Sequence, residues 1–182
     1  IIGRGIPEFA AIERTKVGKQ DHGDYLGFTD LLTLSARGEQ LPILSYYPKK
    51  VEWNGTVVIW IDGAGKSGML TADGKPRPAI AKLLAGGAAV LGGDLLYQGE
   101  FLAGGKPLEQ TPKVNNPREF AGFTFGYNHT VFARRVHDIL TLLAFVSGDE
   151  HKPKMIALVG TGGAGPLVAA ARAIAGPRVN KA

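Results

Sequence analysis

The residues of this sequence that could take part in chemistry gather in three glycine-rich turns, each directly after a short apolar run. The turns span residues 62–68, 92–94 and 160–165. Glycine lets the backbone turn sharply and lets a ligand approach the main-chain N–H groups closely. Turns at the carboxyl ends of parallel strands commonly carry a site. These three turns are therefore the candidate site segments of the chain.

The third turn has the frame of a nucleophile elbow, which reads G-x-S-x-G between a strand and a helix. The sequence from Gly160 to Gly165 is GTGGAG, so Gly162 stands where the elbow needs a serine. Thr161 carries the only hydroxyl of the turn, one residue before the nucleophile position. Covalent acyl transfer needs a hydroxyl or thiol activated by a base. The sequence therefore identifies no catalytic nucleophile here, and Thr161 is kept only as a candidate.

Main-chain N–H groups of two turns could still form an oxyanion hole. Gly63 and Ala64 of the first turn and Gly163 of the third would supply the donors. Such donors stabilise the negative charge that develops during acyl transfer. The sequence thus predicts the frame of an acyl-transfer site without its hydroxyl group.

The glycine turns also allow two other interpretations. Gly160, Gly162 and Gly165 fit the dinucleotide fingerprint G-x-G-x-x-G, which makes a Rossmann-type dinucleotide-binding domain the alternative. That motif typically opens on the first strand of its unit, whereas other strands precede it here, so we expect no nicotinamide or flavin cofactor. Residues 65–67 have the Gly-Lys-Ser ending of a phosphate-binding loop. That loop requires a glycine five residues before Gly65, but position 60 is Trp60, which argues against a phosphate-binding loop.

Five polar residues near the turns complete the candidates. Asp94 and Tyr97 follow a strand at the edge where ligands bind and could contact a substrate, although Asp94 could instead accept hydrogen bonds from loop N–H groups. His129 lies at a helix start beside a long loop and is a candidate catalytic histidine, although capping is its commoner role. His137 is expected on the solvated helix face, and Arg135 is expected to pack its stem on the core with its charge in water. No metal site is expected.

The elements that position these residues alternate between strand and helix. Residues 31–48 predict two strands around a turn at residues 37–39. Buried strands are predicted at Thr56–Ile61, Ala88–Leu91 and Met155–Val159. Helices are predicted at Pro78–Ala85, over Asn128–Val146, and in the alanine-rich stretch that ends at Gly176. This order predicts an α/β fold, three layers α/β/α with a mostly parallel sheet and right-handed crossovers.

The helix over residues 128–146 is the best defined of the three. Asn128 or Thr130 can cap its start, and Gly148 ends it. A helical wheel places Phe132 on the apolar face. The opposite, solvated face is predicted to hold Arg134, His137, Asp138 and Thr141.

Composition excludes several classes of function. The chain has 182 residues, a net charge of +5 and no cysteine, so a thiol nucleophile and a zinc–thiolate site are absent from it. The basic residues are spread out, and we expect no nucleic-acid partner. No apolar run approaches the roughly 20 residues of a membrane span, so no membrane partner is expected. Residues 1–30 show no clear period and are interpreted as an irregular N-terminal arm before a domain at residues 31–182.

Three segments resemble bacterial α/β-hydrolase proteins of the acetyl xylan esterase-like or uncharacterised hydrolase kind. They are residues 94–101 (DLLYQGEF), 116–146 and 158–166 (LVGTGGAGP), and the resemblance covers about residues 31–176. It implies the α/β-hydrolase fold, with the three buried strands as successive central strands. It also implies a small-molecule ester or carbohydrate as substrate. In active members it would imply a serine at position 162, with an acid and a histidine on later strands.

The sequence departs from that family pattern in two ways. Position 162 is glycine, and residue 182 comes before the segments that would hold the acid and the histidine. We therefore expect the N-terminal two-thirds of the fold, with the remainder on the same protein or on another chain. One sheet edge or apolar face is then expected to be uncovered. A non-catalytic relic of the hydrolase fold is the third possibility.

Overall fold

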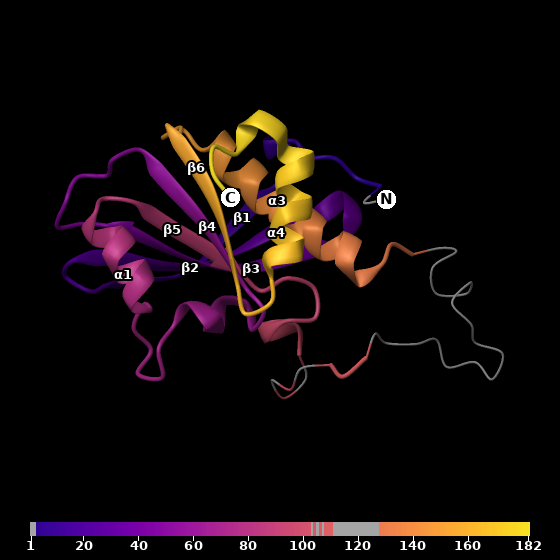
Figure 1. Cartoon of the computed structure of the whole chain (residues 1–182), viewed down its shortest axis with the longest axis horizontal. Helices are drawn as coiled ribbons and strands as arrows, with labels where there is room; N and C mark the ends of the chain where they lie inside the picture. The colour runs from indigo at the N-terminus through magenta and orange to yellow at the C-terminus, as the bar shows by residue number, and fades with distance from the viewer. Residues whose placement is uncertain (1–2, 103, 105, 107, 111–127) are drawn as a thin grey trace.

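The computed structural model describes residues 3–102, 104, 106, 108–110 and 128–182, which form one six-stranded sheet with helices on both faces (Figure 1). The strands are β1 (Glu13–Asp21), β2 (Tyr25–Leu34), β3 (Glu39–Pro48), β4 (Thr56–Asp62), β5 (Ala89–Gly93) and β6 (Met155–Thr161). The helices are α1 (Pro78–Ala85), α3 (Val131–Gly148) and α4 (Gly165–Ala175). The strands lie in the order β1-β2-β3-β5-β4-β6.

The sheet is parallel only in the part that carries the predicted buried strands. β4 pairs in parallel with β5 and with β6, which confirms that the strand at 56–61 neighbours the strand at 155–159. The pairs β1–β2, β2–β3 and β3–β5 are antiparallel, so the prediction of a mostly parallel sheet was wrong. The reason is the short connections between the first three strands, which can join only antiparallel neighbours. The predicted turn is confirmed, with Gly38 in the left-handed conformation at φ 62°.

From Glu13 on, the N-terminal segment forms strands and not an irregular arm. β1 pairs along its length with β2, which itself begins at Tyr25, so the prediction for residues 1–30 was wrong over both strands. All nine residues of β1 are exposed. A strand without a buried face shows no alternation of apolar and polar residues, so its sequence carries no period-two signal.

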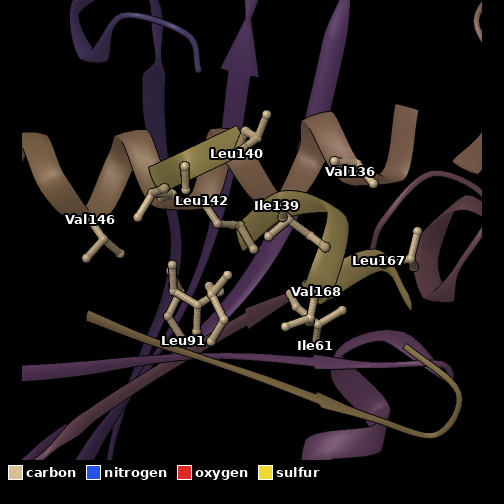
Figure 2. Close-up of a cluster of buried hydrophobic side chains, with 14 of the residues drawn as sticks. Ile61, Leu91, Val136, Ile139, Leu140, Leu142, Val146, Leu167 and Val168 are labelled. Carbon is tan, nitrogen blue, oxygen red and sulfur yellow. The ribbon is translucent and has the colours of Figure 1, made fainter. Parts of the chain in front are cut away.

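Successive side chains of the parallel strands enter two separate cores. Ile59 and Ile61 of β4 face α3 and α4, whereas Val58 and Trp60 face α1. Figure 1 shows α1 (magenta) on one side of the sheet and α3 and α4 (orange and yellow) on the other. In Figure 2, side chains of α3 and α4 converge with Ile61 and Leu91 into the larger core. The predicted three-layer arrangement of helices around this part of the sheet is confirmed.

Helix α3 begins and ends where its signals indicate, but its solvated face is misplaced. The Thr130 hydroxyl accepts a hydrogen bond from Ala133 N at 3.1 Å, and the helix ends at Gly148. His137 and Thr141 are 1% and 2% exposed, whereas Phe132 is 43% exposed, which reverses the prediction for these residues. The helix packs on the sheet and on α4, and the chain around Glu39 covers a further side. A one-face wheel cannot show burial from several sides.

The two outer strands of the sheet are β1 and β6. Beyond β6, the described part of the chain adds one isolated bridge, between Ala157 and Lys181. Across the described residues, no helix combines the length and the apolar character that a membrane span requires.

Candidate functional site

The turns after β4, β5 and β6 meet at one edge of the sheet. Because these strands are parallel, their carboxyl ends lie on the same side. Asp62 is paired with Thr161 in the register, so the β4 and β6 turns start level with each other. The first and third of the sequence-predicted turns therefore lie side by side, as an oxyanion hole would require.

The Asp62 carboxylate lies between the β4 and β6 turns. Asp62 is 7% exposed, and its Oδ1 accepts a hydrogen bond from Ala64 N at 2.8 Å. Its Oδ2 accepts from the Thr161 hydroxyl at 2.7 Å. The Thr161 hydroxyl is thus hydrogen-bonded to a buried carboxylate on the neighbouring strand.

The elbow has a backbone that favours glycine at two successive residues. Gly162 has φ 56° and Gly163 has φ 87°. A Cβ atom added to Gly162 would lie 2.8 Å from Asp62 Oδ1 and 3.0 Å from Gly63 N. A Cβ atom added to Gly163 would meet no atom within 4 Å. Position 162 therefore lacks room for a side chain while Asp62 keeps its place.

The three predicted oxyanion donors are brought close together but differ in their hydrogen bonds. Gly63 N donates to Thr161 O at 3.2 Å, and Ala64 N donates to Asp62. Gly163 N has no hydrogen-bond partner in the part of the chain that is described. A ligand oxygen could bind Gly163 N directly, whereas the other two donors would first have to exchange a partner. The assignment of Gly63, Ala64 and Gly163 as an oxyanion hole stays a prediction.

The Asp94 carboxylate connects the turn after β4 with the turn after β5. It is fully buried and accepts hydrogen bonds from Lys66 N at 2.8 Å and Glu100 N at 3.1 Å. The Lys66 ammonium lies 3.4 Å from the same carboxylate and also pairs with Glu100. This geometry is the loop-bonding role that the sequence left open for Asp94, and it also places Lys66 in an ion pair.

Gln98 is a buried polar residue whose role the sequence does not indicate by any motif. It is 4% exposed, its Oε1 accepts from Leu95 N at 3.1 Å, and its Nε2 donates to Gly63 O at 2.9 Å. Gln98 therefore ties the β5 turn to the backbone of the β4 turn. Its position four residues after Asp94, within the same loop, is the only sequence signal that pointed to it.

A cavity of about 680 Å³ opens over the β4 and β5 turns and the start of α3. Its polar wall includes Ser67, Tyr97, Gln98 and Arg135, and its apolar wall includes Leu102 and Val131. Gly63 and Ala64 also line it, so two of the predicted oxyanion residues and Tyr97 share one cavity. We call this cavity the carboxyl-edge pocket.

The other predicted site residues lie outside the lining of the carboxyl-edge pocket. Asp94 is buried beneath the turns that follow β4 and β5. Thr161, Gly162 and Gly163 form the elbow after β6 and do not line the pocket. His129 is exposed, and its ring lies against Gly3, where an added Cβ would be 3.2 Å from Nδ1. Within the described residues, no group of three or more His, Cys, Asp or Glu side chains could hold a metal ion.

Helix α3 carries two neighbouring ionisable residues, His137 and Asp138, which the sequence predicted on the solvated face. Burial lowers the pKa of His137 to about 4, opposed by Glu39, whose Oε2 lies 3.6 Å from Nδ1. Arg37, Arg4 and Arg134 lower it further, and the Arg37 Nη1 lies 3.4 Å from the ring Nε2. Burial raises the pKa of the neighbouring Asp138 carboxyl to about 6, opposed by the hydrogen bond that it accepts from Leu96 N.

These two shifts predict opposite pH dependences of stability. The pKa of His137 is depressed in the folded state, so its contribution is present above pH 6.5 and is lost as pH falls toward 4. The pKa of Asp138 is raised, so its contribution is present below pH 3.8 and is lost as pH rises through 6. Asp138→Asn lacks the stability that wild type gains when Asp138 takes up a proton in the folded state. When the pH falls from 6.5 to 4, the unfolding free energy of this variant should therefore drop by on the order of 2 kcal/mol relative to that of wild type. His137→Gln should change in the opposite direction, as measured by urea unfolding at both pH values; parallel curves would contradict the assignment.

The structure is similar to solved esterases at low sequence identity. It matches acetyl xylan esterase 1 from Thermoanaerobacterium sp. with a TM-score of 0.62 at 17% identity, covering 92% of this chain and 50% of that one. It matches an acetyl xylan esterase from Paenibacillus sp. with a TM-score of 0.61 at 18% identity, covering 92% and 51%. It matches a glucuronoyl esterase from Solibacter usitatus with a TM-score of 0.58 at 13% identity, covering 92% and 50%.

These similarities show a shared α/β fold and no more than the fold. The chain spans about half the length of the esterases it matches. No protein-family profile matches the sequence, and no curated protein matches it.

Proposed function

We propose that this chain is part of an α/β-hydrolase-type protein related to carbohydrate esterases, with a partial hydrolase-like domain that begins at β1 and not at residue 31. In this proposal the carboxyl-edge pocket binds a small ester or carbohydrate. No acyl-enzyme forms at residue 162. The observation that carries the proposal is the elbow itself, a strand–turn–helix whose residue 162 has no room for a side chain beside Asp62. The similarity to acetyl xylan and glucuronoyl esterases supports the choice of ligand class.

The proposal extends to the remainder of the fold. The chain covers about half of each matched esterase, and β6 is an outer strand of the sheet. Further strands, on the same protein or on another chain, would add to that edge and supply the acid and histidine that active relatives of this fold would carry. The complete site would then combine the carboxyl-edge pocket with an acid and a histidine from those further strands.

Two alternatives make different demands on the same turn. A dinucleotide-binding domain would place a pyrophosphate at Gly160–Gly165, yet this turn follows β6 and not the first parallel strand of the chain. Calorimetric binding of NAD at micromolar concentration, abolished by Gly162→Val, would favour that alternative. A non-catalytic binding or structural relic of the hydrolase fold would hydrolyse no ester.

The ligand proposal predicts a role for Tyr97 in affinity. Titration calorimetry with acetylated xylo-oligosaccharides should detect binding to the wild-type chain. Tyr97→Ala should weaken that binding on the order of tenfold, because it removes an aromatic contact surface from the pocket wall. Tyr47→Ala is the matched control, since Tyr47 is 37% exposed and lies outside this pocket. Equal affinities of the two variants would count against the carboxyl-edge pocket as the ligand site.

A further inference from the structure

Tyr97 has a backbone conformation that its residue type disfavours. Its φ is 58°, and it is the only residue other than glycine with a positive φ in the described part of the chain. Such a conformation costs of the order of 1–3 kcal/mol and persists only where the surrounding structure holds it. Strained residues of this kind cluster at ligand sites.

Two side chains of α3 bind the backbone of the Leu96–Tyr97 segment from one side. The Arg135 guanidinium donates from Nε to Leu96 O at 2.8 Å and from Nη2 to Tyr97 O at 3.0 Å. The Asp138 carboxylate accepts from Leu96 N at 2.8 Å. Residues 135 and 138 are three apart on α3, so both side chains project from neighbouring points of the same helix. Three hydrogen bonds thus fix backbone groups of two successive residues, Leu96 and Tyr97.

The arrangement suits arginine in particular. Its planar fork presents two N–H donors in a fixed geometry, which a lysine ammonium on a flexible stem does not reproduce. Arg135 also lines the carboxyl-edge pocket, and partial burial of its side chain lowers the pKa of the guanidinium. The expectation that Arg135 holds its charge in water was therefore wrong. The guanidinium is turned toward the loop backbone.

We propose that Arg135 and Asp138 are positioning residues for the carboxyl-edge pocket, which hold Tyr97 in its left-handed conformation at the pocket wall. The inference rests on the proposed function where it concerns ligand affinity. The positioning itself concerns only the backbone of residues 96–97. Neither residue is assigned a catalytic role.

Hydrogen exchange tests the positioning without any ligand. The exchange rate of the Leu96 amide at pH 7 is measured by NMR on the 182-residue chain. Asp138→Leu removes the acceptor and should raise that rate at least tenfold. Asp138→Asn keeps an acceptor oxygen and should leave the rate within about threefold of wild type. Equal rates in the two variants would overturn the role of Asp138.

A double-variant cycle tests whether Arg135 acts through Tyr97. Arg135→Met keeps an apolar stem and removes both donors, so it should weaken binding of an acetylated xylo-oligosaccharide on the order of tenfold. Arg135→Lys should restore little of that loss. Glycine adopts φ 58° freely, so in a Tyr97→Gly background Arg135→Met should have almost no further effect on affinity. An undiminished effect in that background would overturn the proposal.

The two failures can be told apart. If the wild-type chain binds no acetylated xylo-oligosaccharide, the proposed function fails, while the exchange rates of the Asp138 variants still decide the positioning. If the ligand binds and Arg135→Met leaves its affinity unchanged, the positioning role in binding fails and the proposed function stands.

Discussion

Gly63→Ala should lower the free energy of unfolding by about 3 kcal/mol, because the added methyl group would overlap the backbone of the neighbouring turn. A Cβ atom at Gly63 would lie well under 3.0 Å from the carbonyl oxygen of Gly162, a distance that real Cβ atoms essentially never show. The oxygen belongs to the main chain and cannot rotate away as a side chain could. Gly63 is also fixed on both sides, since its N–H donates to Thr161 O and its carbonyl accepts from Gln98.

The matched control for Gly63→Ala is Gly165→Ala. Gly165 opens α4, its φ is not positive, and an added Cβ would meet no atom within 4 Å. Its unfolding free energy should stay within about 0.5 kcal/mol of wild type. Urea unfolding of both variants measures the difference. If Gly63→Ala proves as stable as Gly165→Ala, the β4 and β6 turns do not approach each other as described.

The parallel half of the fold could be predicted from the sequence because its signals are local. An apolar run, a glycine turn and a helix with a cap follow one another, and the structure places β4, α1, β5, α3, β6 and α4 in that order. The strand β1 could not be predicted, because it has no buried face and its stability as a strand comes from pairing with β2. The direction of the sheet was misjudged because the pairs β1–β2 and β3–β5, which the order of strands and helices does not indicate, are antiparallel.

The candidate site could be predicted only as a set of turns. The sequence identified the segments at Gly63 and Gly162, and the structure brings them side by side. The sequence could not show that Asp62 fills the space beside Gly162, because the two residues are about one hundred positions apart along the chain. The roles of Gln98 and Arg135 were missed in the same way, since both bind backbone groups that only the folded loops bring near.

Gly162→Ser should not create a reactive serine and should destabilise the fold. A side chain at φ 56° is strained, and its Cβ would press on Asp62 Oδ1 and on Gly63 N. Together these effects should cost about 2–3 kcal/mol of unfolding free energy. Gly163→Ser is the matched control, because φ 87° imposes a similar strain while an added Cβ meets no atom within 4 Å. The control should cost about 1 kcal/mol.

The identity of the obstacle can be measured by removing Asp62 as well. Asp62→Ala alone loses the hydrogen bonds to Ala64 N and the Thr161 hydroxyl, so it is destabilising by itself. If Asp62 is what excludes a side chain, the cost of the double variant should fall short of the sum of the single costs by about 1 kcal/mol. Strict additivity would place the obstacle elsewhere.

Chemistry at the elbow is tested with the same variants. A serine-directed phosphonate should label neither the wild-type chain nor Gly162→Ser. The Thr161 hydroxyl does donate to the Asp62 carboxylate, but it lies one residue before the nucleophile position, and a carboxylate is a weaker general base than an imidazole. His129 is exposed and does not line the carboxyl-edge pocket. An ester substrate should show no burst of product for the same reason. Mass spectrometry locates any label. Stoichiometric labelling of the wild-type chain at Thr161 would identify the nucleophile at that residue, and labelling of Gly162→Ser at position 162 would mean that Asp62 yields and that a base lies within reach of the elbow.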